Sequence, residues 1–150
     1  IIDYIEDSHR TLDWYVAQLE KRPYRWGTDF LPHDGKTKNF QTGKSTQQQL
    51  MAMGRRDVQV LSAMNVEEGI KLARMLFPRC FFDESKTARL LECLRRYRRA
   101  IHTKTDEPMA PLHDEFSHGA DMYRYIGQAI DLMRNSTHHE YTEAPAPVCY

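Results

Sequence analysis

Residues His113 to Tyr125 read His-Asp-Glu-Phe-Ser-His-Gly-Ala-Asp-Met-Tyr-Arg-Tyr, and they predict the start of the last helix of the chain. Two prolines interrupt regular structure just before this stretch, and Ser117 is a residue type that caps helices. Helical spacing then puts His118 and Asp121 on one face. An imidazole beside a carboxylate can bind a divalent metal, although the same pattern is typical of a capped surface helix.

The composition is that of one globular domain. The chain has 150 residues, of which 41% are hydrophobic, and 21 Lys and Arg balance 21 Asp and Glu. Zero net charge gives no overall attraction to nucleic acid, so any such attraction must come from local clusters. No apolar run is long enough to span a bilayer, and the start lacks the layout of a signal peptide. Three widely spaced cysteines favour reduced thiols over a disulfide framework.

The N-terminal region predicts a strand over residues 1–6, a helix over 12–21 and a strand over 24–31. Two strands joined by a crossover helix are expected to be parallel, with their carboxyl ends at the same sheet edge. The second strand delivers Asp34 to that edge, where ligands of open α/β sheets collect. Asp34 is therefore a candidate site residue, although Pro-His-Asp-Gly at 32–35 is also good turn chemistry.

The rest of the chain continues the alternation of helices and strands. The expected elements are a helix over 45–53, a strand over 58–61, helices over 65–77 and 83–100, an edge strand over 101–105 and a polar linker over 106–111. Gly-Lys-Ser at 43–45 lacks the first glycine of a phosphate-binding loop, so a nucleotide-binding loop is excluded.

Two basic clusters are candidate DNA contacts. One is the polar loop with Lys36, Lys38 and Lys44, and the other is the end of the 83–100 helix, with Arg95, Arg96, Arg98 and Arg99. Because the helix dipole favours cations in a last turn regardless of function, a solvated helix end stays an equal interpretation of the arginines.

The acidic candidates suit phosphodiester hydrolysis. Two-metal catalysis needs several carboxylates from separate elements, and Asp34 and Asp121 can supply two of them. Mg²⁺ and Mn²⁺ prefer oxygen ligands, with water filling the remaining positions. His118 would either ligate a metal or carry a proton near the attacking water.

Several blocks in order resemble the C-terminal nuclease domain of the large terminase subunit of tailed bacteriophages. They are Pro-His-Asp-Gly at 32–35, Thr-Gly-Lys-Ser at 42–45, His-Asp at 113–114 and Ser-His-Gly-Ala-Asp-Met-Tyr-Arg-Tyr at 117–125. The resemblance covers most of residues 1–134. It implies an α/β, ribonuclease-H-like fold over these residues, a mixed sheet flanked by helices that lacks its first strands at the N-terminus. Residues 135–150 are expected to form a flexible tail.

This resemblance implies a metal-dependent endonuclease that cleaves concatemeric double-stranded DNA during genome packaging, with Mg²⁺ or Mn²⁺ in a two-metal site. Asp34 matches the family's fourth-strand acid, Asp121 matches its final-helix acid, and His118 matches a histidine that some members use. The family's first acid lies upstream of the strand at residues 1–6. The chain alone is therefore expected to cleave weakly or not at all.

The implied partners are double-stranded DNA and, in the intact assembly, the portal protein and the small terminase subunit, with no membrane. The implied location is the host cell cytoplasm, outside the mature virion. Two alternatives stay open. The chain is a non-catalytic DNA- or portal-docking fragment that uses the two basic clusters, or it is part of a related ribonuclease-H-like resolvase.

Overall fold

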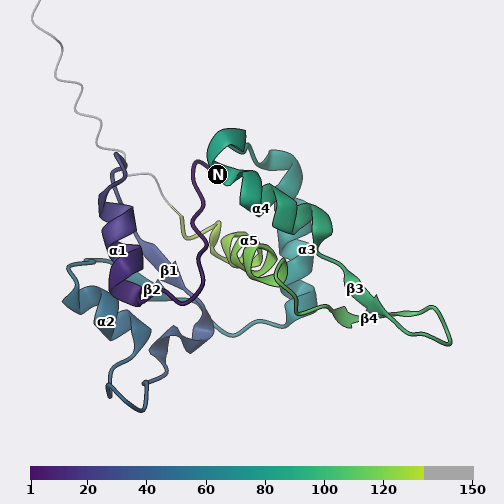
Figure 1. Cartoon of the computed structure of the whole chain (residues 1–150), viewed down its shortest axis with the longest axis horizontal. Helices are drawn as coiled ribbons and strands as arrows, with labels where there is room; N and C mark the ends of the chain where they lie inside the picture. The colour runs from purple at the N-terminus through teal and green to yellow at the C-terminus, as the bar shows by residue number, and fades with distance from the viewer. Residues whose placement is uncertain (134–150) are drawn as a thin grey trace, which may run out of the picture.

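The computed structural model describes residues 1–133, which form two packed halves (Figure 1). We call residues 11–61 the sheet half; it contains α1 (Leu12–Glu20), β1 (Asp29–Leu31), the 3-10 helix η1 (His33–Lys36), α2 (Thr46–Ala52) and β2 (Val58–Val60). We call residues 65–130 the helical half; it contains α3 (Val66–Leu76), the 3-10 helix η2 (Phe77–Arg79), α4 (Glu84–Arg96), β3 (Arg99–Ile101), β4 (Pro108–Pro111) and α5 (Ser117–Ala129). The described chain is therefore a mixed α/β protein, as the alternating pattern predicts.

The sheet half is built on one parallel pair of strands, each only three residues long. Asp29–Leu31 lies opposite Val58–Val60 residue by residue, and α2 forms part of the connection between the two strands. The predicted strand at 58–61 is confirmed. The predicted strand over 24–31 is shorter than expected, because only its last three residues pair with another strand.

Residues 1–6 run extended between the two halves, but they pair with no strand of the described chain, so the predicted first strand is wrong. Arginines from both halves bind the acidic side chains of this segment instead, one just after α1 and one in α4. Arg22 Nε donates to Asp3 Oδ2 at 2.6 Å, and Arg89 Nε donates to Glu6 Oε2 at 3.1 Å. The predicted crossover from this segment to the next strand therefore does not form, and the parallel partner of β1 is β2.

Local capping decides where three of the helices begin. Gln48 N donates to Ser45 Oγ at 3.2 Å and Ser45 N donates to Gln48 Oε1 at 3.0 Å, which is a complete capping box for α2. The side chains of Asn65 and Asp83 accept amide hydrogen bonds at the starts of α3 and α4. These helix starts confirm the sequence-based predictions.

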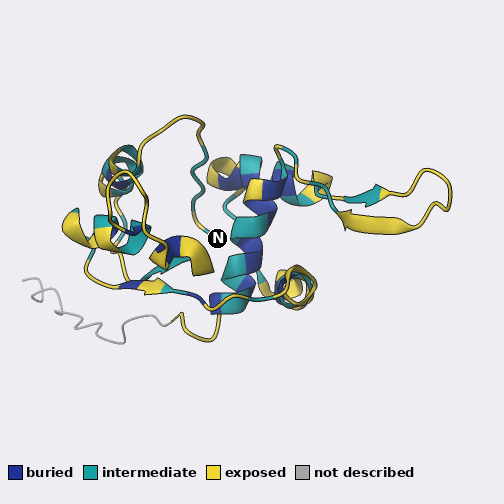
Figure 2. Cartoon of the chain, turned by 90° about the horizontal axis from the view of Figure 1, so that it is seen from below, coloured by how far each residue is buried: buried dark blue, intermediate teal, exposed yellow. Residues whose placement is uncertain are grey.

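Helix α5 forms the centre of the helical half and packs against both α3 and α4, and its buried residues are prominent in Figure 2. Tyr123 is buried, with its ring 5.9 Å from that of Phe77 and 6.0 Å from that of Phe82, and its hydroxyl donates to Cys80 Sγ at 3.2 Å. Gly127 allows α3 and α5 to approach closely, since a Cβ there would lie 3.0 Å from a backbone nitrogen of α3.

The strands β3 and β4 form an antiparallel hairpin that projects from the helical half (Figure 1). The prediction of a plain linker over 106–111 is therefore wrong, and the edge strand expected over 101–105 lies slightly earlier in the chain. The His102 amide donates to the Glu107 carbonyl at 2.9 Å and closes the turn. Proline at both ends of β4 offers no amide there, which is tolerated because β4 is an edge strand.

Two further features of residues 1–133 concern membrane-spanning helices and cysteines. Within these residues, no helix combines the length and the apolar character needed to cross a membrane. Cys80 and Cys93 form no disulfide within this part of the chain. The expected tail over 135–150 lies outside the described residues.

Candidate functional site

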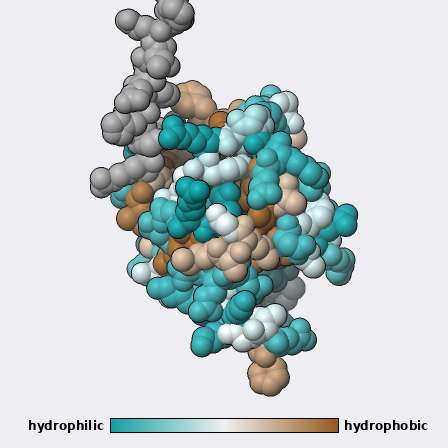
Figure 3. Space-filling model, turned by 90° about the vertical axis from the view of Figure 1, so that its left-hand side faces the viewer, coloured by the Kyte–Doolittle hydropathy of each residue, from teal (hydrophilic) through white to brown (hydrophobic). Residues whose placement is uncertain are grey.

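A groove between α1, β1 and α5 brings together two of the regions that the sequence singled out. Its volume is about 730 Å³. The whole of β1 and the Pro32 that follows its carboxyl end form one wall, and the first turns of α5 form another, through His118 and Asp121. Apolar side chains of α1 and α5 line the rest of the groove. In Figure 3, where the sheet half faces the viewer, hydrophobic side chains are visible between hydrophilic ones.

Asp34 lies just beyond the wall that β1 contributes. It is the second residue of η1, which begins directly after Pro32, and its side chain is exposed and makes no hydrogen bond with any described residue. The turn is tight, because the Gly35 amide donates to the Pro32 carbonyl at 2.9 Å, and a Cβ on Gly35 would lie 2.8 Å from Leu31 Cβ. The expected turn chemistry and the expected position at a strand end therefore both hold for Asp34.

Asp121 lines the groove from α5, and its partner is an arginine of the same helix. Arg124 Nε donates to Asp121 Oδ1 at 3.2 Å, and the guanidinium carbon of Arg124 lies 4.6 Å from the centroid of the Tyr125 ring. Arg124 is buried, and its alkyl chain passes over Gly69, where a Cβ would lie 2.7 Å away. Asp121 is therefore a half-buried carboxylate whose charge is balanced by a cation fixed in position.

The predicted cap of α5 is corrected by the structure. Ser117 is the first helical residue rather than the cap, and its Oγ donates back to the Asp114 carbonyl at 2.7 Å. The Asp114 side chain accepts from the Phe116 amide at 3.0 Å, so Asp114 stabilises the turn before the helix. His118 is exposed, and its ring lies 5.6 Å from that of His113. The local sequence therefore builds a histidine pair beside the groove.

Asp29 is a groove carboxylate that the sequence analysis missed. It is the first residue of β1, and Arg55 binds it through two nitrogens, with Nε donating to Oδ2 at 2.6 Å. The hydrogen bond to Asp29 raises the pKa of Arg55 above its ordinary value. No local signal marks this pair, because the two residues are 26 positions apart in the chain.

The side chains at this site do not by themselves build a metal centre. Among residues 1–133, no group of three or more His, Cys, Asp or Glu side chains is placed to hold one ion. Asp29 and Asp121 each bind an arginine, and Asp34 points from a neighbouring turn. A two-metal site requires more oxygen ligands than this set supplies.

The predicted basic loop is exposed and folds into a turn. Lys38 pairs with Ser45 in an isolated antiparallel bridge, and the Asn39 amide donates to the Lys44 carbonyl at 3.0 Å. Lys36 is the last residue of η1, two positions after Asp34. The three lysines are therefore presented on one ordered loop that follows the candidate strand end.

The four predicted arginines separate into different surroundings. Arg96 binds Glu92 at 3.3 Å, and Arg99 binds Glu67. Arg95 and Arg98 are exposed and form no ion pair with a described residue. The end of α4 is therefore not one uniform basic patch, because half of its charge is neutralised locally.

No protein-family model, curated protein or solved structure matches this chain. The functional interpretation therefore depends on the geometry above and on the residues of the motifs.

Proposed function

We propose that this chain is a ribonuclease-H-like nuclease domain of the kind found in the large terminase subunit of tailed bacteriophages. It would cleave double-stranded DNA with a divalent metal, Mg²⁺ or Mn²⁺. The observation that carries the proposal is the groove, because the carboxyl end of β1 and the first turns of α5 face each other across it. This is the arrangement in which a strand-end acid and a final-helix acid would act together.

In this proposal Asp34 and Asp121 are the metal-binding carboxylates, and His118 is a supporting residue. The tight turn at Gly35 holds Asp34 next to the groove, and Arg124 fixes the orientation of Asp121. When bound, the metal would activate water and stabilise the leaving oxygen. Because the described side chains offer too few ligands, a further carboxylate must complete the site, and the chain alone should cleave weakly or not at all.

Plasmid nicking with Mn²⁺ tests this proposal in a longer protein that carries the domain behind an upstream acidic strand. Asp34→Ala and Asp121→Ala should each abolish nicking while circular dichroism remains unchanged. Asp13→Ala is the matched control, since Asp13 is exposed in the first turn of α1 and does not line the groove. Retained nicking in either variant would remove that residue from the site, and robust nicking by residues 1–150 alone would contradict the need for a further carboxylate.

The proposal implies the portal protein and the small terminase subunit as partners, and the host cell cytoplasm as the location. A non-catalytic docking fragment is the second candidate, supported by the exposed lysine loop and by Arg95 and Arg98, which form no ion pair with any of residues 1–133. The two functions differ in how DNA binding responds to solution conditions. Binding that falls steeply with salt and ignores Mn²⁺ favours docking, whereas metal-dependent binding lost in Asp34→Ala favours the nuclease.

A further inference from the structure

A second cavity lies on the other side of α5, away from β1, and we call it the arginine pocket. It is enclosed by α3, the end of α4 with β3, and α5, and its volume is about 260 Å³. Four arginines contribute to its lining, Arg74, Arg98, Arg99 and Arg124. A cavity of this size lies just below the usual range for small-molecule sites, so it suits a small ligand.

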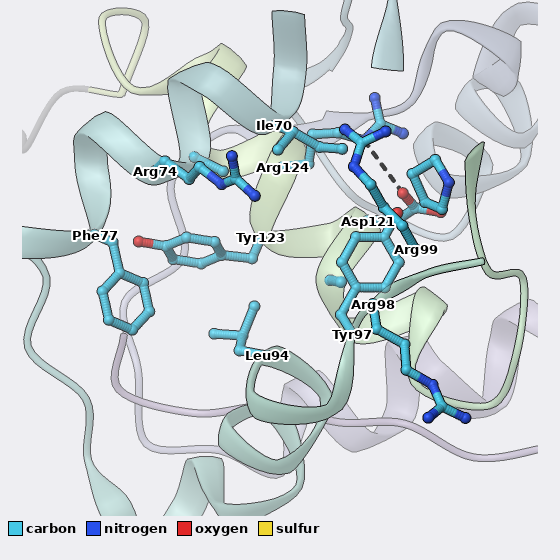
Figure 4. Close-up of a pocket in the computed structure, with 13 residues that line it drawn as sticks. Ile70, Arg74, Phe77, Leu94, Tyr97, Arg98, Arg99, Asp121, Tyr123 and Arg124 are labelled. Carbon is cyan, nitrogen blue, oxygen red and sulfur yellow. Dashed lines mark hydrogen bonds and ion pairs between the residues drawn. The ribbon is translucent and has the colours of Figure 1, made fainter. Parts of the chain in front are cut away.

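The arginine pocket carries a net positive charge. Among the described residues, Asp121 is the one carboxylate that lines it, and it binds Arg124, while Glu67 reaches Arg99 from the rim. The guanidinium groups of Arg74, Arg99 and Arg124 against these two carboxylates leave one positive charge, since the Arg98 side chain is directed away from the centre (Figure 4). Arg74 makes no ion pair or hydrogen bond with a described residue, so its five donors are available to a ligand.

Arg124 gives the pocket a fixed cation. It is only 8% exposed, and its one hydrogen bond to a described residue uses Nε, on Asp121. Its terminal nitrogens therefore remain free of partners within residues 1–133. Because no buried side-chain nitrogen of the described residues lacks a partner, these terminal nitrogens keep contact with solvent. A guanidinium that is held in place and keeps accessible, unused donors is suited to bind an anionic oxygen.

Aromatic rings form the apolar part of the arginine pocket. Tyr123 and Phe77 lie on one side and Tyr97 on the other, with Leu94 between them (Figure 4). Tyr123 is buried and its hydroxyl donates to Cys80 Sγ, so Tyr123 forms part of the apolar wall, while the ring of Tyr97 is partly exposed. Figure 4 also shows the Arg98 side chain directed away from the centre. Aromatic rings beside guanidinium groups favour a planar ligand that carries a negative charge.

We propose that the arginine pocket binds a phosphate monoester attached to a planar ring, of the nucleoside 5′-monophosphate class. The phosphate is attracted by the net positive charge of the pocket, and Arg74 with Arg124 would bind its oxygens. The base would pack on the ring of Tyr97. The same chemistry is offered by a free nucleotide and by the 5′-phosphorylated end of a DNA strand. The arginine pocket shares Asp121 and Arg124 with the proposed nuclease site, but nucleotide binding there requires no metal.

Calorimetry with adenosine 5′-monophosphate in EDTA tests the site without any divalent metal. Adenosine 5′-monophosphate should bind at least tenfold more tightly than adenosine or inorganic phosphate alone. Arg74→Gln should weaken this binding at least tenfold. Arg25→Gln is the matched control, because Arg25 is exposed in the sheet half and does not line the pocket; it should leave binding unchanged.

A second variant separates the ring from the charge. Tyr97→Leu should keep the affinity for inorganic phosphate but lose the preference for the nucleotide, with the melting temperature confirming that the variant is folded.

A 5′-phosphorylated oligonucleotide that binds more tightly than its 5′-hydroxyl form would identify a strand end as the source, and equal weak binding of both would identify the free nucleotide. Equal affinity for nucleotide and adenosine, binding of phosphate alone, or no effect of Arg74→Gln would overturn the proposal. Because no metal is present, these outcomes do not depend on whether the nuclease proposal holds.

Discussion

The two halves of the molecule bury their side chains very differently. The helical half contains fully buried side chains such as Leu90 and Cys93, and Tyr123 is 2% exposed. The sheet half has a small cluster of Val16, Leu50 and Val58, and each of these keeps 5 to 7% of its surface exposed. Its apolar side chains also line an open groove rather than a closed core. The helical half therefore contributes more of the folding free energy.

This difference has a structural cause. Helices satisfy their own backbone hydrogen bonds, so α3, α4 and α5 can pack face to face and close a core among themselves. Two strands of three residues satisfy few backbone groups and expose two open edges. The candidate nuclease groove lies at the boundary between the halves, where the weakly packed strand end meets the well-packed helix.

The largest expected effect is loss of the aromatic cluster in the helical half. Tyr123→Ala should destabilise the protein by about 3 to 5 kcal/mol, because it leaves a cavity beside Phe77 and Phe82. Urea unfolding monitored by circular dichroism measures this loss. Tyr123→Phe keeps the ring and removes only the hydrogen bond to Cys80, so it should cost about 1 kcal/mol. If Tyr123→Ala lowers the free energy of unfolding by less than Tyr123→Phe does, the aromatic cluster does not stabilise the helical half.

A pair of glycine substitutions compares the packing of the halves directly. Gly127→Ala should destabilise by about 1 to 3 kcal/mol, because the new methyl group meets the backbone of α3. Helix propensity alone would favour alanine by about 1 kcal/mol, so a destabilisation reports the close contact. Gly27→Ala in the sheet half has open space around it and should change stability by less than about 0.5 kcal/mol. Equal effects in thermal denaturation would contradict the difference in packing.

The capping box of α2 gives the next effect, within the sheet half. Ser45→Ala should cost about 1 kcal/mol, because the Gln48 amide at the helix start loses its acceptor. Native-state hydrogen exchange measures whether the loss is confined to α2 and its neighbouring strands. Ser45→Asp keeps an acceptor and should recover most of the stability. An exchange increase that includes α5 would show that the two halves unfold as one unit.

The smallest effect near neutral pH is the loss of stability in alkali, which comes mainly from groups of the helical half and also from Tyr4, whose pKa is raised by burial. Burial raises the pKa of the Cys93 thiol and of the Tyr97 and Tyr123 hydroxyls above their ordinary values. A group whose pKa is raised in the folded state holds its proton there after the unfolded chain has lost it. The folded state is therefore progressively destabilised once the pH rises above the unfolded pKa values of about 8.5 for cysteine and about 10 for tyrosine.

Unfolding at pH 7, 9 and 10.5 checks this pH dependence. Stability should be similar between pH 7 and 8 and should fall at the highest pH. Tyr97→Phe removes one of the titrating groups and should reduce the fall. A free energy of unfolding that rises between pH 7 and 10.5 would contradict this prediction, since these groups release their protons more readily from the unfolded chain.

Capping and short turns could be predicted from the sequence because they depend on neighbours in the chain. Ser45, Asn65 and Asp83 each accept amide hydrogen bonds within three residues, so helix starts at these positions could be predicted from the sequence. The turn that holds Asp34 was also evident, since proline and glycine limit the backbone locally. Ser117 was assigned the wrong role because serine can equally bond to the preceding carbonyl, and tertiary packing selected that geometry.

Pairings between distant residues were decided by the tertiary structure. Residues 1–6 alternate like a strand, yet their partners are Arg22 and Arg89, which no local pattern reveals. The Asp29 pair with Arg55 and the position of Arg124 across Gly69 also bring together side chains that are far apart in sequence. The sequence determined by itself the mixed α/β class, most helix starts and the acidic motif residues. Only the packing of α5 against both halves decided which of those residues share a groove, because burial and charge pairing depend on neighbours in space rather than along the chain.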